Sequence, residues 1–539
     1  MTVLAKRRLT SALLVGLLAL LAVFATSRHA APALASARSL TSVSWDLPEG
    51  EPGSLDPALA GTSSSTEPLS NMCEPLTRYT ATGKLEPWLA SSYRQPNPKT
   101  LVLTIRSGVK FWDGKPLTAA DVVYSLTRQL NPKLGGTWTD PWFTDVASVK
   151  QTGANQVTVR FTQPDAVFAE IMSTTAGQIS EAAYATAKGK EYGTSAGGLM
   201  CTGPYEFVKW TPGQSILMKA NPHYWNASQA ASVKTLTFDF ITDPNTLTNA
   251  LISGEIDGTY EVPVGSVGRL RTSAEGTLHL SRSVAFEIAT FTQKPGPIRN
   301  VDVRKALTIA IDRSEIVKSL YQRAAAPVWS INMPTMWSYG SSIFSKTYRS
   351  LSGAHVDLAQ AKSLVSAAGT AASGTITVLV SAANPTDQEI AAYMQSVAAS
   401  IGLHISIVTT APGRFVQVLF DPKLLNTYDM LLDEGAWDIP DPIEPLMFVA
   451  LPGSILDTSG FNNAHVTALI NQARGSTNLT QRAHLLDQAT AIYQGQFFGE
   501  MLVANPDERL FENRAVTGAP TSPLGYLYTP WAVSLRATG

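Results

Sequence analysis

The sequence predicts an α/β protein with more than one lobe. Its 539 residues are too many for a single ordinary domain, and 44% apolar with only 15% charged residues can bury large cores. Residues 376–380 alternate like a strand, Thr386 with Glu389 opens an expected helix, and residues 403–408 form another strand. Such a strand–helix–strand run is typical of a parallel sheet covered by helices. We therefore expect two or three lobes.

The N-terminal segment has the features of a secretory signal peptide. A Lys-Arg-Arg sequence at residues 6–8 precedes an apolar run at residues 12–24, and small residues end at the expected cleavage points, Ala35 or Ala37. The run is short for a membrane span of about 20 residues, and an uncleaved anchor is the alternative. Because no cysteine lies near the cleavage points, we expect an exported protein, periplasmic or extracellular, without a lipid anchor.

Residues 101–130 combine three local structures in a clear order. Apolar residues alternate at residues 101–105, which is the period of a half-buried strand. Asp113-Gly114 is strong turn chemistry. Thr118 with Asp121 three residues later forms a capping box that opens a helix. The segment therefore reads as a strand, a turn and a capped helix.

The amino-acid sequence of this segment resembles the signature of the family 5 extracellular solute-binding proteins, the peptide- and nickel-type receptors of bacterial ABC importers. Further segments resemble the same family in the same order, and they are residues 54–57, 71–79, 84–92, 201–225, 243–258, 300–321 and 357–369. Each match is weak alone, but unrelated chains would have no reason to reproduce the order. The resemblance extends from about residue 43 to about residue 516.

The resemblance implies a two-lobed α/β fold of the periplasmic-binding-protein type, with a small extra domain inserted in the first lobe. Two crossing strands join the lobes in that family, and here they fall near residues 287–293 and 500–504. The expected division in chain order is a signal peptide at 1–37, the first lobe at 38–75, the inserted domain at 76–195, the first lobe again at 196–290, the second lobe at 291–500 and a return to the first lobe at 501–539.

Several local predictions accompany these segments. Residues 71–79 and 84–92 are expected to be helix and loop pieces, and residues 300–321 to form the helix that starts the second lobe. Pro212-Gly213 is a turn inside a hairpin.

The two cysteines, Cys73 and Cys201, invite pairing because the chain is expected to be exported and the count is even. Two buried free thiols are the alternative, and spacing alone does not decide between them. The family resemblance places both cysteines on the first lobe, which favours a disulfide.

Signals for an enzyme, a cofactor or a nucleic-acid partner are weak. Residues 193–197 spell G-x-S-x-G around Ser195, but a nucleophile elbow needs a strand before it and a helix after it, so a flexible loop is favoured. None of the seven histidines has a metal-ligand spacing, and the cysteines are too far apart for a zinc knuckle. A net charge of -1 gives no positive electrostatic field that would attract the phosphate backbone of a nucleic acid. We expect no catalysis, no cofactor, no metal and no nucleic acid; a nickel-type role would need scattered His or Arg ligands.

The most informative candidate for ligand binding is the segment at residues 434–448. In peptide receptors of the family, a Trp followed by an Asp, with Asp-Pro three residues later, lies in the second lobe, and that first Asp pairs with the peptide's amino terminus. Asp438 and Asp441 keep this spacing. Trp437 directly precedes Asp438, where relatives usually leave a gap of two, so Asp441 could take the role.

Each of these ligand candidates also has an alternative role that involves no ligand. The acidic segment could be a solvated turn held by prolines. Arg414, expected in a loop, could hold a carboxylate or be an ordinary surface arginine.

The resemblance implies an exported receptor that captures a peptide-like solute between two lobes and delivers it to the permease of an ABC importer. A monomer is expected. The alternatives are a sensory or chaperone-like binding protein of the same fold that feeds no transporter, and a secreted serine hydrolase that uses Ser195.

Overall fold

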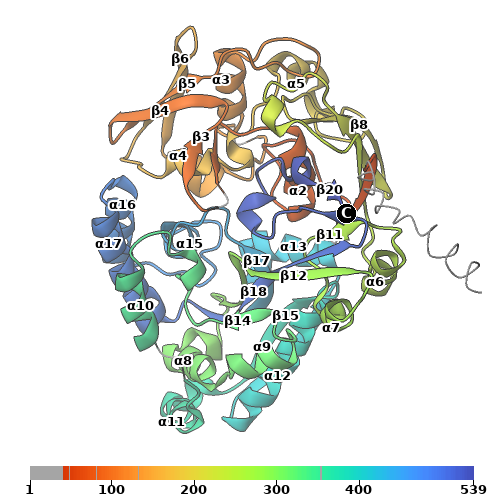
Figure 1. Cartoon of the computed structure of the whole chain (residues 1–539). Helices are drawn as coiled ribbons and strands as arrows, with labels where there is room; N and C mark the ends of the chain where they lie inside the picture. The colour runs from red at the N-terminus through yellow and green to blue at the C-terminus, as the bar shows by residue number, and fades with distance from the viewer. Residues whose placement is uncertain (1–39, 48, 81, 132, 352–354, 539) are drawn as a thin grey trace, which may run out of the picture. The chain divides into compact units, whose positions relative to one another are not determined.

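A twelve-stranded sheet connects the two halves of the chain (Figure 1). At one end, three parallel strands lie together: β15 (Thr375–Ser381), β16 (His404–Thr410) and β17 (Met430–Ala436). Towards the other end, β1 (Ser42–Asp46) is parallel to both β10 (Thr235–Asp239) and β11 (Gly258–Thr259). The predicted parallel sheet of the second lobe is therefore confirmed.

Two long strands link these parallel groups. β13 (Ala285–Phe291) pairs with β17 and with β18 (Glu500–Asn513), and both pairings are antiparallel. β18 continues past this pairing to β11, so it reaches from one parallel group to the other. The expected crossing strands at residues 287–293 and 500–504 lie on these two elements. The computed structural model describes residues 40–538 except 48, 81, 132 and 352–354, and the predicted signal peptide lies outside the described residues. Leu40–Arg536 form one compact unit.

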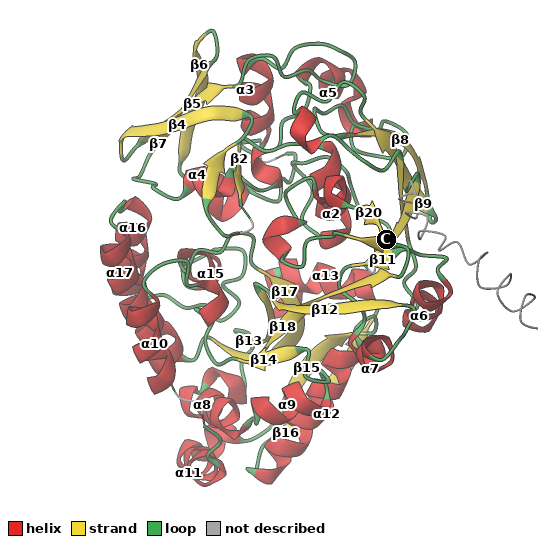
Figure 2. Ribbon diagram, viewed as in Figure 1, coloured by secondary structure: helices red, strands yellow, loops and turns green. Residues whose placement is uncertain are grey.

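A separate four-stranded sheet lies within the range predicted as the inserted domain (Figure 2). Its strand order is β4 (Ala90–Asn97), β5 (Thr100–Ile105), β7 (Gln156–Phe161) and β6 (Val146–Gly153). After β5, Gly114 adopts φ 87° in the predicted turn. Asp121 then accepts a hydrogen bond from the Thr118 backbone at 2.9 Å and opens α3 (Ala119–Arg128). The strand, turn and capped helix are confirmed, whereas the boundaries of the inserted domain remain a prediction.

The remaining elements have the following bounds. The helices are α2 (Ser63–Met72), α4 (Phe168–Ile171), α5 (Ala182–Lys188), α6 (Pro244–Ser253), α7 (Val267–Arg271), α8 (Val301–Ala310), α9 (Arg313–Ser319), α10 (Ser341–Ser350), α11 (Leu358–Ala368), α12 (Pro385–Ser400), α13 (Pro412–Phe420), α14 (Pro422–Leu425), α15 (Ile443–Val449), α16 (Ala464–Gly475) and α17 (Leu479–Ile492). The strands are β2 (Thr77–Tyr79), β3 (Leu85–Pro87), β8 (Tyr205–Thr211), β9 (Ser215–Ala220), β12 (Gly276–Arg282), β14 (Ala325–Pro327), β19 (Val516–Thr517) and β20 (Arg536–Ala537). None of the described helices is long and apolar enough to cross a membrane.

The prediction of helix and loop at residues 71–79 and 84–92 was wrong in part. Helix α2 ends at Met72, and the chain then forms the β2–β3 pair and the start of β4. Pro75 explains the early end, because a proline disfavours the helical conformation of the residue before it and cannot donate its own nitrogen.

Two further helix boundaries differ from the predictions. The run at residues 300–321 contains two helices, because Ile311 is extended and Asp312 caps the new helix α9. Helix α12 is capped by Asn384 with Pro385 at its first position, so Thr386 is not the cap. Asparagine is a strong cap and proline is well suited to the first turn, and together they outweigh the Thr386–Glu389 pattern.

The predicted disulfide between Cys73 and Cys201 is present. Beside it, the carboxylate of Glu74 is fully buried and accepts hydrogen bonds from four side chains. The donors are Trp88 Nε1 at 2.9 Å, Thr202 Oγ1 at 2.7 Å, Tyr224 Oη at 2.7 Å and Trp225 Nε1 at 2.9 Å. We call this group the Glu74 cluster. It joins the β2–β3 pair, the segments that flank the β8–β9 hairpin, and the disulfide into one scaffold.

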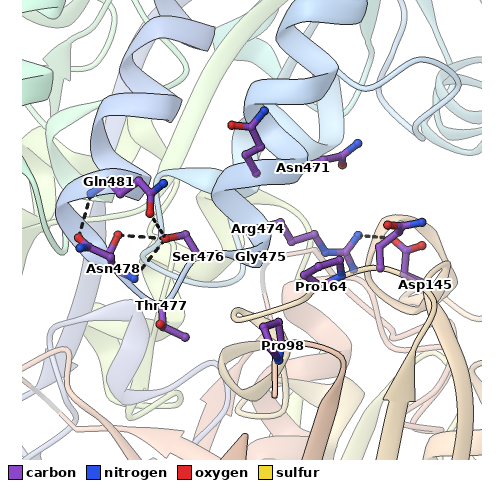
Figure 3. A pocket seen from close by; sticks show the side chains of 12 residues that line it. Pro98, Asp145, Pro164, Asn471, Arg474, Gly475, Ser476, Thr477, Asn478 and Gln481 are labelled. Carbon is purple, nitrogen blue, oxygen red and sulfur yellow. Dashed lines mark hydrogen bonds and ion pairs between the residues drawn. The ribbon is translucent and has the colours of Figure 1, made fainter. Parts of the chain in front are cut away.

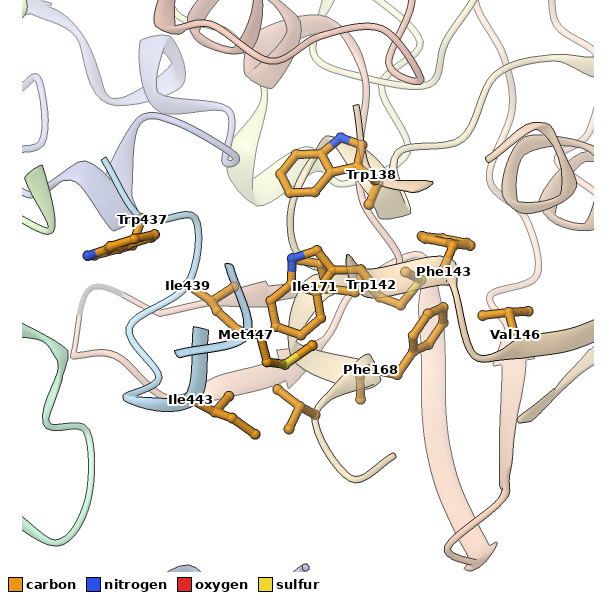
Figure 4. Close-up of a cluster of buried hydrophobic side chains, with 14 of the residues drawn as sticks. Trp138, Trp142, Phe143, Val146, Phe168, Ile171, Trp437, Ile439, Ile443 and Met447 are labelled. Carbon is orange, nitrogen blue, oxygen red and sulfur yellow. The ribbon is translucent and has the colours of Figure 1, made fainter. Parts of the chain in front are cut away.

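One apolar core runs from the predicted inserted domain into the second lobe (Figure 4). On one side it contains Trp142, Phe143 and Ile171, and on the other Ile439, Ile443 and Met447, all at most 2% exposed. Burial of each such side chain stabilises the fold by roughly 1.5–3 kcal/mol. This core therefore holds the segment around residue 440 firmly against the neighbouring part of the chain.

Candidate ligand-binding site

The predicted ligand segment begins where β17 ends. Strands β15, β16 and β17 are parallel, so their carboxyl ends meet at one edge of the sheet, which is where ligands bind in open α/β sheets. Trp437 is the first residue beyond β17, and its backbone donates to the Val284 carbonyl at 3.2 Å. Its ring is 3% exposed and packs on Phe286 at a centroid distance of 4.4 Å. Among the described residues, no acceptor reaches the Trp437 indole N–H.

Asp438 follows on this edge and is half-buried. Its Oδ1 accepts a hydrogen bond from Tyr528 Oη at 2.6 Å. Tyr528 belongs to the core that contains β1, β8, β9 and β10, so this contact joins the loop of the second lobe to the first. Burial raises the pKa of Asp438 to about 6, against the hydrogen bonds from Tyr528 and Glu444.

Glu444 lies in the first turn of α15 and is 0% exposed. It contacts the backbone of Asp438. Its Oε2 accepts the backbone N–H groups of Asp438 at 3.0 Å and of Ile439 at 2.9 Å. Burial, followed by the charge of Asp438, raises the pKa of Glu444 well above its usual range. Glu444 therefore holds the backbone of the loop at Asp438 and Ile439.

Asp441 has a different environment. It is 1% exposed, its Oδ1 accepts from Tyr339 Oη and from the Ile443 backbone at 2.9 Å, and its Oδ2 pairs with Arg482 at 2.5 Å. Both oxygens are thus engaged in holding the loop on α17. This pairing favours Asp438 over Asp441 as the free carboxylate.

Arg414 lies in helix α13, not in the predicted loop. Pro412 at the first helical position starts the helix directly after β16, which the loop prediction overlooked. The guanidinium is exposed and donates to Gln417 at 2.7 Å. It lies on the helix that begins beside the carboxyl end of β16.

Sequence reasoning missed a set of carboxylates on both parallel groups. Glu261, after β11, accepts from Ser63 at 2.7 Å, and Glu49, after β1, accepts from the Ser64 backbone at 3.1 Å. Burial and the charges of Glu49 and Glu508 raise the pKa of Glu261 to about 8. Glu49 and Glu261 lie just beyond the parallel strands β1 and β11, and this position is the signal that could have found them.

These carboxylates face the second lobe. Burial, followed by the charges of Glu434 and Glu49, raises the pKa of Asp433 on β17 to about 7. Arg509 on β18 pairs with Glu434 at 3.4 Å. The edge of the sheet is therefore acidic where the two lobes meet.

A cavity of 580 Å³ lies elsewhere, between the predicted inserted domain and the turn from α16 to α17 (Figure 3). Arg474 closes one side through ion pairs with Asp145 at 2.9 Å and Asp165 at 2.7 Å. None of the predicted ligand residues lines it.

The hydrolase hypothesis lacks its structural context. Ser195 is exposed in a turn that follows a single 3-10 turn at Gly189–Glu191, so no strand precedes it. Within the described ranges, no group of three or more His, Cys, Asp or Glu side chains is arranged to hold a metal ion.

Comparison with known proteins agrees with this architecture. The model of the bacterial extracellular solute-binding proteins, family 5 (middle), matches residues 84–455. The oligopeptide-binding protein OppA of Bacillus subtilis is 27% identical over 488 residues, which cover 84% of this chain and 85% of that protein. The periplasmic murein peptide-binding protein MppA of Escherichia coli is 24% identical over 463 residues, which cover 82% and 83%.

Solved structures show the same two-lobed fold. The periplasmic binding protein DppA of Helicobacter pylori, in complex with the peptide STSA, has a TM-score of 0.80 at 19% identity and covers 92% of this chain and 98% of its own. The binding protein AgaA of A. tumefaciens R10, in complex with agropinic acid, has a TM-score of 0.80 at 21% identity and covers 92% and 99%. Because the family model matches more than half of the residues, the chain belongs to the family 5 bacterial extracellular solute-binding proteins.

Proposed function

We propose that this protein is an exported receptor that captures a peptide-like solute between its lobes and delivers it to the permease of an ABC importer. It performs no chemistry on the solute and acts as a monomer. Family membership and the peptide-binding names of OppA and MppA support this role. The observation that carries it is the carboxylate of Asp438, which stands where the second lobe meets Tyr528 of the first.

Asp438 is the proposed anchor for the amino terminus of the solute. It is half-buried, so a ligand can reach it, and its pKa of about 6 leaves it ionised at neutral pH. Asp441, by contrast, is already paired with Arg482. An ammonium group held by Asp438 would be removed from water when the lobes close, which strengthens the ion pair.

Trp437 and Arg414 have supporting parts in this proposal. The ring of Trp437 fixes the loop on Phe286, and its unpaired indole N–H is a donor for a solute carbonyl. Arg414, on the helix after β16, is the proposed partner for a solute carboxylate.

The test compares Asp438→Asn with Asp441→Asn by titration calorimetry. The probes are a tryptic digest of casein and the same digest after N-acetylation. Removing one partner of a desolvated pair costs about 2–5 kcal/mol, so Asp438→Asn should weaken binding by at least roughly 30-fold. Asp441→Asn should change affinity much less, although it lowers the melting temperature by breaking the pair with Arg482.

The acetylated digest decides the anchor. Wild-type protein should bind it far more weakly than the free peptides. Equal binding of both digests would remove Asp438 as an amine site. If neither digest binds, and mass spectrometry of the purified protein finds no bound peptide, the peptide-receptor proposal fails.

A further inference from the structure

Arg474, in the last turn of the second-lobe helix α16, is bound to the predicted inserted domain and is 4% exposed. Its Nε and Nη2 donate to Asp165 Oδ2 at 3.0 and 2.7 Å, and its Nη1 donates to Asp145 Oδ2 at 2.9 Å (Figure 3). Its backbone carbonyl accepts the N–H of Ala166 at 2.7 Å. Because all three nitrogens of the rigid guanidinium are engaged, this contact forms in one geometry only.

A glycine allows the two parts to approach this closely. Gly475, the last residue of α16, lies against Pro164. A Cβ atom at Gly475 would lie 2.7 Å from the Cβ of Pro164, whereas two carbon atoms pack at about 3.5–4.0 Å. Alanine is a better helix former than glycine, so an alanine would suit the helix at this position but not the contact.

The predicted inserted domain is fixed to the first lobe on another side. Trp88 donates to Glu74 at 2.9 Å, and the backbone N–H of Trp112 donates to the carbonyl of Cys201 at 3.2 Å. The disulfide of Cys201 with Cys73 closes this connection. The second lobe can therefore move away from the first only if Arg474 leaves the inserted domain.

Both sides of the Arg474 contact remain satisfied when they separate. Asp165 Oδ1 accepts the backbone N–H groups of Val167 and Phe168, each at 2.9 Å, and these bonds lie within the inserted domain. Water can hydrate Asp165 Oδ2 and the guanidinium once the two parts are apart. The contact can therefore open and form again without leaving a buried charge unpaired.

We propose that Arg474 and Gly475 form a latch between the second lobe and the inserted domain, which holds the lobes closed and retains a captured solute. None of the predicted ligand residues lines the cavity beside the latch, so the latch acts on affinity without contacting the solute. It does so by raising the population of the closed conformation, because observed affinity scales with the fraction of binding-competent receptor. The effect on affinity rests on the proposed receptor function, whereas the latch itself does not.

The test follows hydrogen exchange of the Ala166 amide by mass spectrometry, because its bond to the Arg474 carbonyl breaks when the latch opens. Gly475→Ala and Arg474→Gln should each raise this exchange rate by at least about tenfold, while the amides of β5 stay protected. Gly413→Ala is the matched control for the added methyl group, because a Cβ there meets nothing within 4 Å. Arg349→Gln, at an exposed arginine of the second lobe, is the control for the lost charge.

The exchange data decide whether the latch exists. Unchanged exchange of Ala166 in Gly475→Ala would overturn the proposal. Faster exchange of Ala166 together with β5 would also contradict it, because the domain would then unfold rather than separate. If Arg474→Gln does not fold, Gly475→Ala decides alone, since alanine favours the helix that carries it.

Calorimetry with the casein digest then measures the effect on solute retention. Gly475→Ala and Arg474→Gln should bind the digest about tenfold more weakly than wild type, and the two controls should bind it equally well. An open latch with unchanged affinity would contradict its part in retention. If the wild type binds no peptide, the receptor function fails, while the exchange of Ala166 still decides the latch.

Discussion

Glu74 and Glu444 are both 0% exposed, but their partners differ. Four side-chain donors from Trp88, Thr202, Tyr224 and Trp225 surround Glu74 and fill its acceptor sites. Glu444 receives two backbone N–H groups on one oxygen, and no described donor reaches the other. Burial raises the pKa of both groups, and donors oppose the shift more fully at Glu74.

The difference separates a fully hydrogen-bonded scaffold carboxylate from one with an unused oxygen. A buried charge is stable when its hydrogen bonds are complete, and removing a partner leaves the others unsatisfied. A buried carboxyl group with an oxygen that receives no donor lacks this compensation. The Glu74 cluster therefore sets stability, whereas Glu444 keeps one oxygen without a described donor in the loop that carries the proposed anchor, Asp438.

Removing the disulfide should give the largest effect, because it links Cys73 beside Glu74 to Cys201 beside Thr202. The bond joins residues 128 apart in the chain. Constraint of so long a loop in the unfolded chain is worth about 5 kcal/mol. Cys73→Ala with Cys201→Ala should lower the free energy of unfolding by about that amount. Urea unfolding followed by circular dichroism measures it, and alkylation of both thiols in the native wild type would contradict the pairing.

Glu74→Gln should give the next largest effect, a loss of about 3 kcal/mol in the free energy of unfolding. The amide replaces an acceptor with a donor that faces the donors of the cluster, such as Trp88 and Tyr224. Peptide affinity of the folded variant should stay near that of wild type. An unfolding midpoint equal to that of wild type would show that Glu74 is not the scaffold carboxylate we describe.

Stability should fall as pH rises through the neutral range. The folded-state pKa values of Asp438, Asp433 and Glu261 are raised to about 6, about 7 and about 8. A raised carboxyl pKa means that the folded protein holds the proton more tightly, so this stabilisation is complete below the unfolded value near 4 and is lost as pH passes the folded value. Urea unfolding should give a free energy higher by more than about 1 kcal/mol at about pH 5 than at about pH 8. A free energy that rises between these pH values would contradict the raised pKa values.

Glu444→Gln should have the smallest effect on stability, below about 1 kcal/mol. The amide oxygen of a glutamine can accept the same Asp438 and Ile439 backbone N–H groups, and no described donor is left facing the amide nitrogen. The same substitution is thus costly at position 74 and tolerated at position 444. Equal losses in urea unfolding of the two variants would remove the distinction between them.

Elements that depend on neighbouring residues could be predicted from the amino-acid sequence. The strand, turn and capped helix at residues 100–128, the Pro212-Gly213 hairpin and the parallel strands of the second lobe were all predicted. Such signals lie within a few residues of one another, where propensity and capping act. Boundaries were wrong where a second local signal was stronger, as at Pro75 and Asn384.

The contacts that build the candidate site could not be predicted in this way, because they join residues far apart in the chain. Asp438 could be proposed from its resemblance to a family motif, but its partner Tyr528 lies 90 residues away in the chain. Asp441 looked equivalent until its carboxylate was found paired with Arg482, 41 residues away. Glu444 is close in sequence, yet its complete burial depends on the core that joins two distant segments. Burial and long-range pairing arise from packing of the whole chain, so local patterns do not contain them.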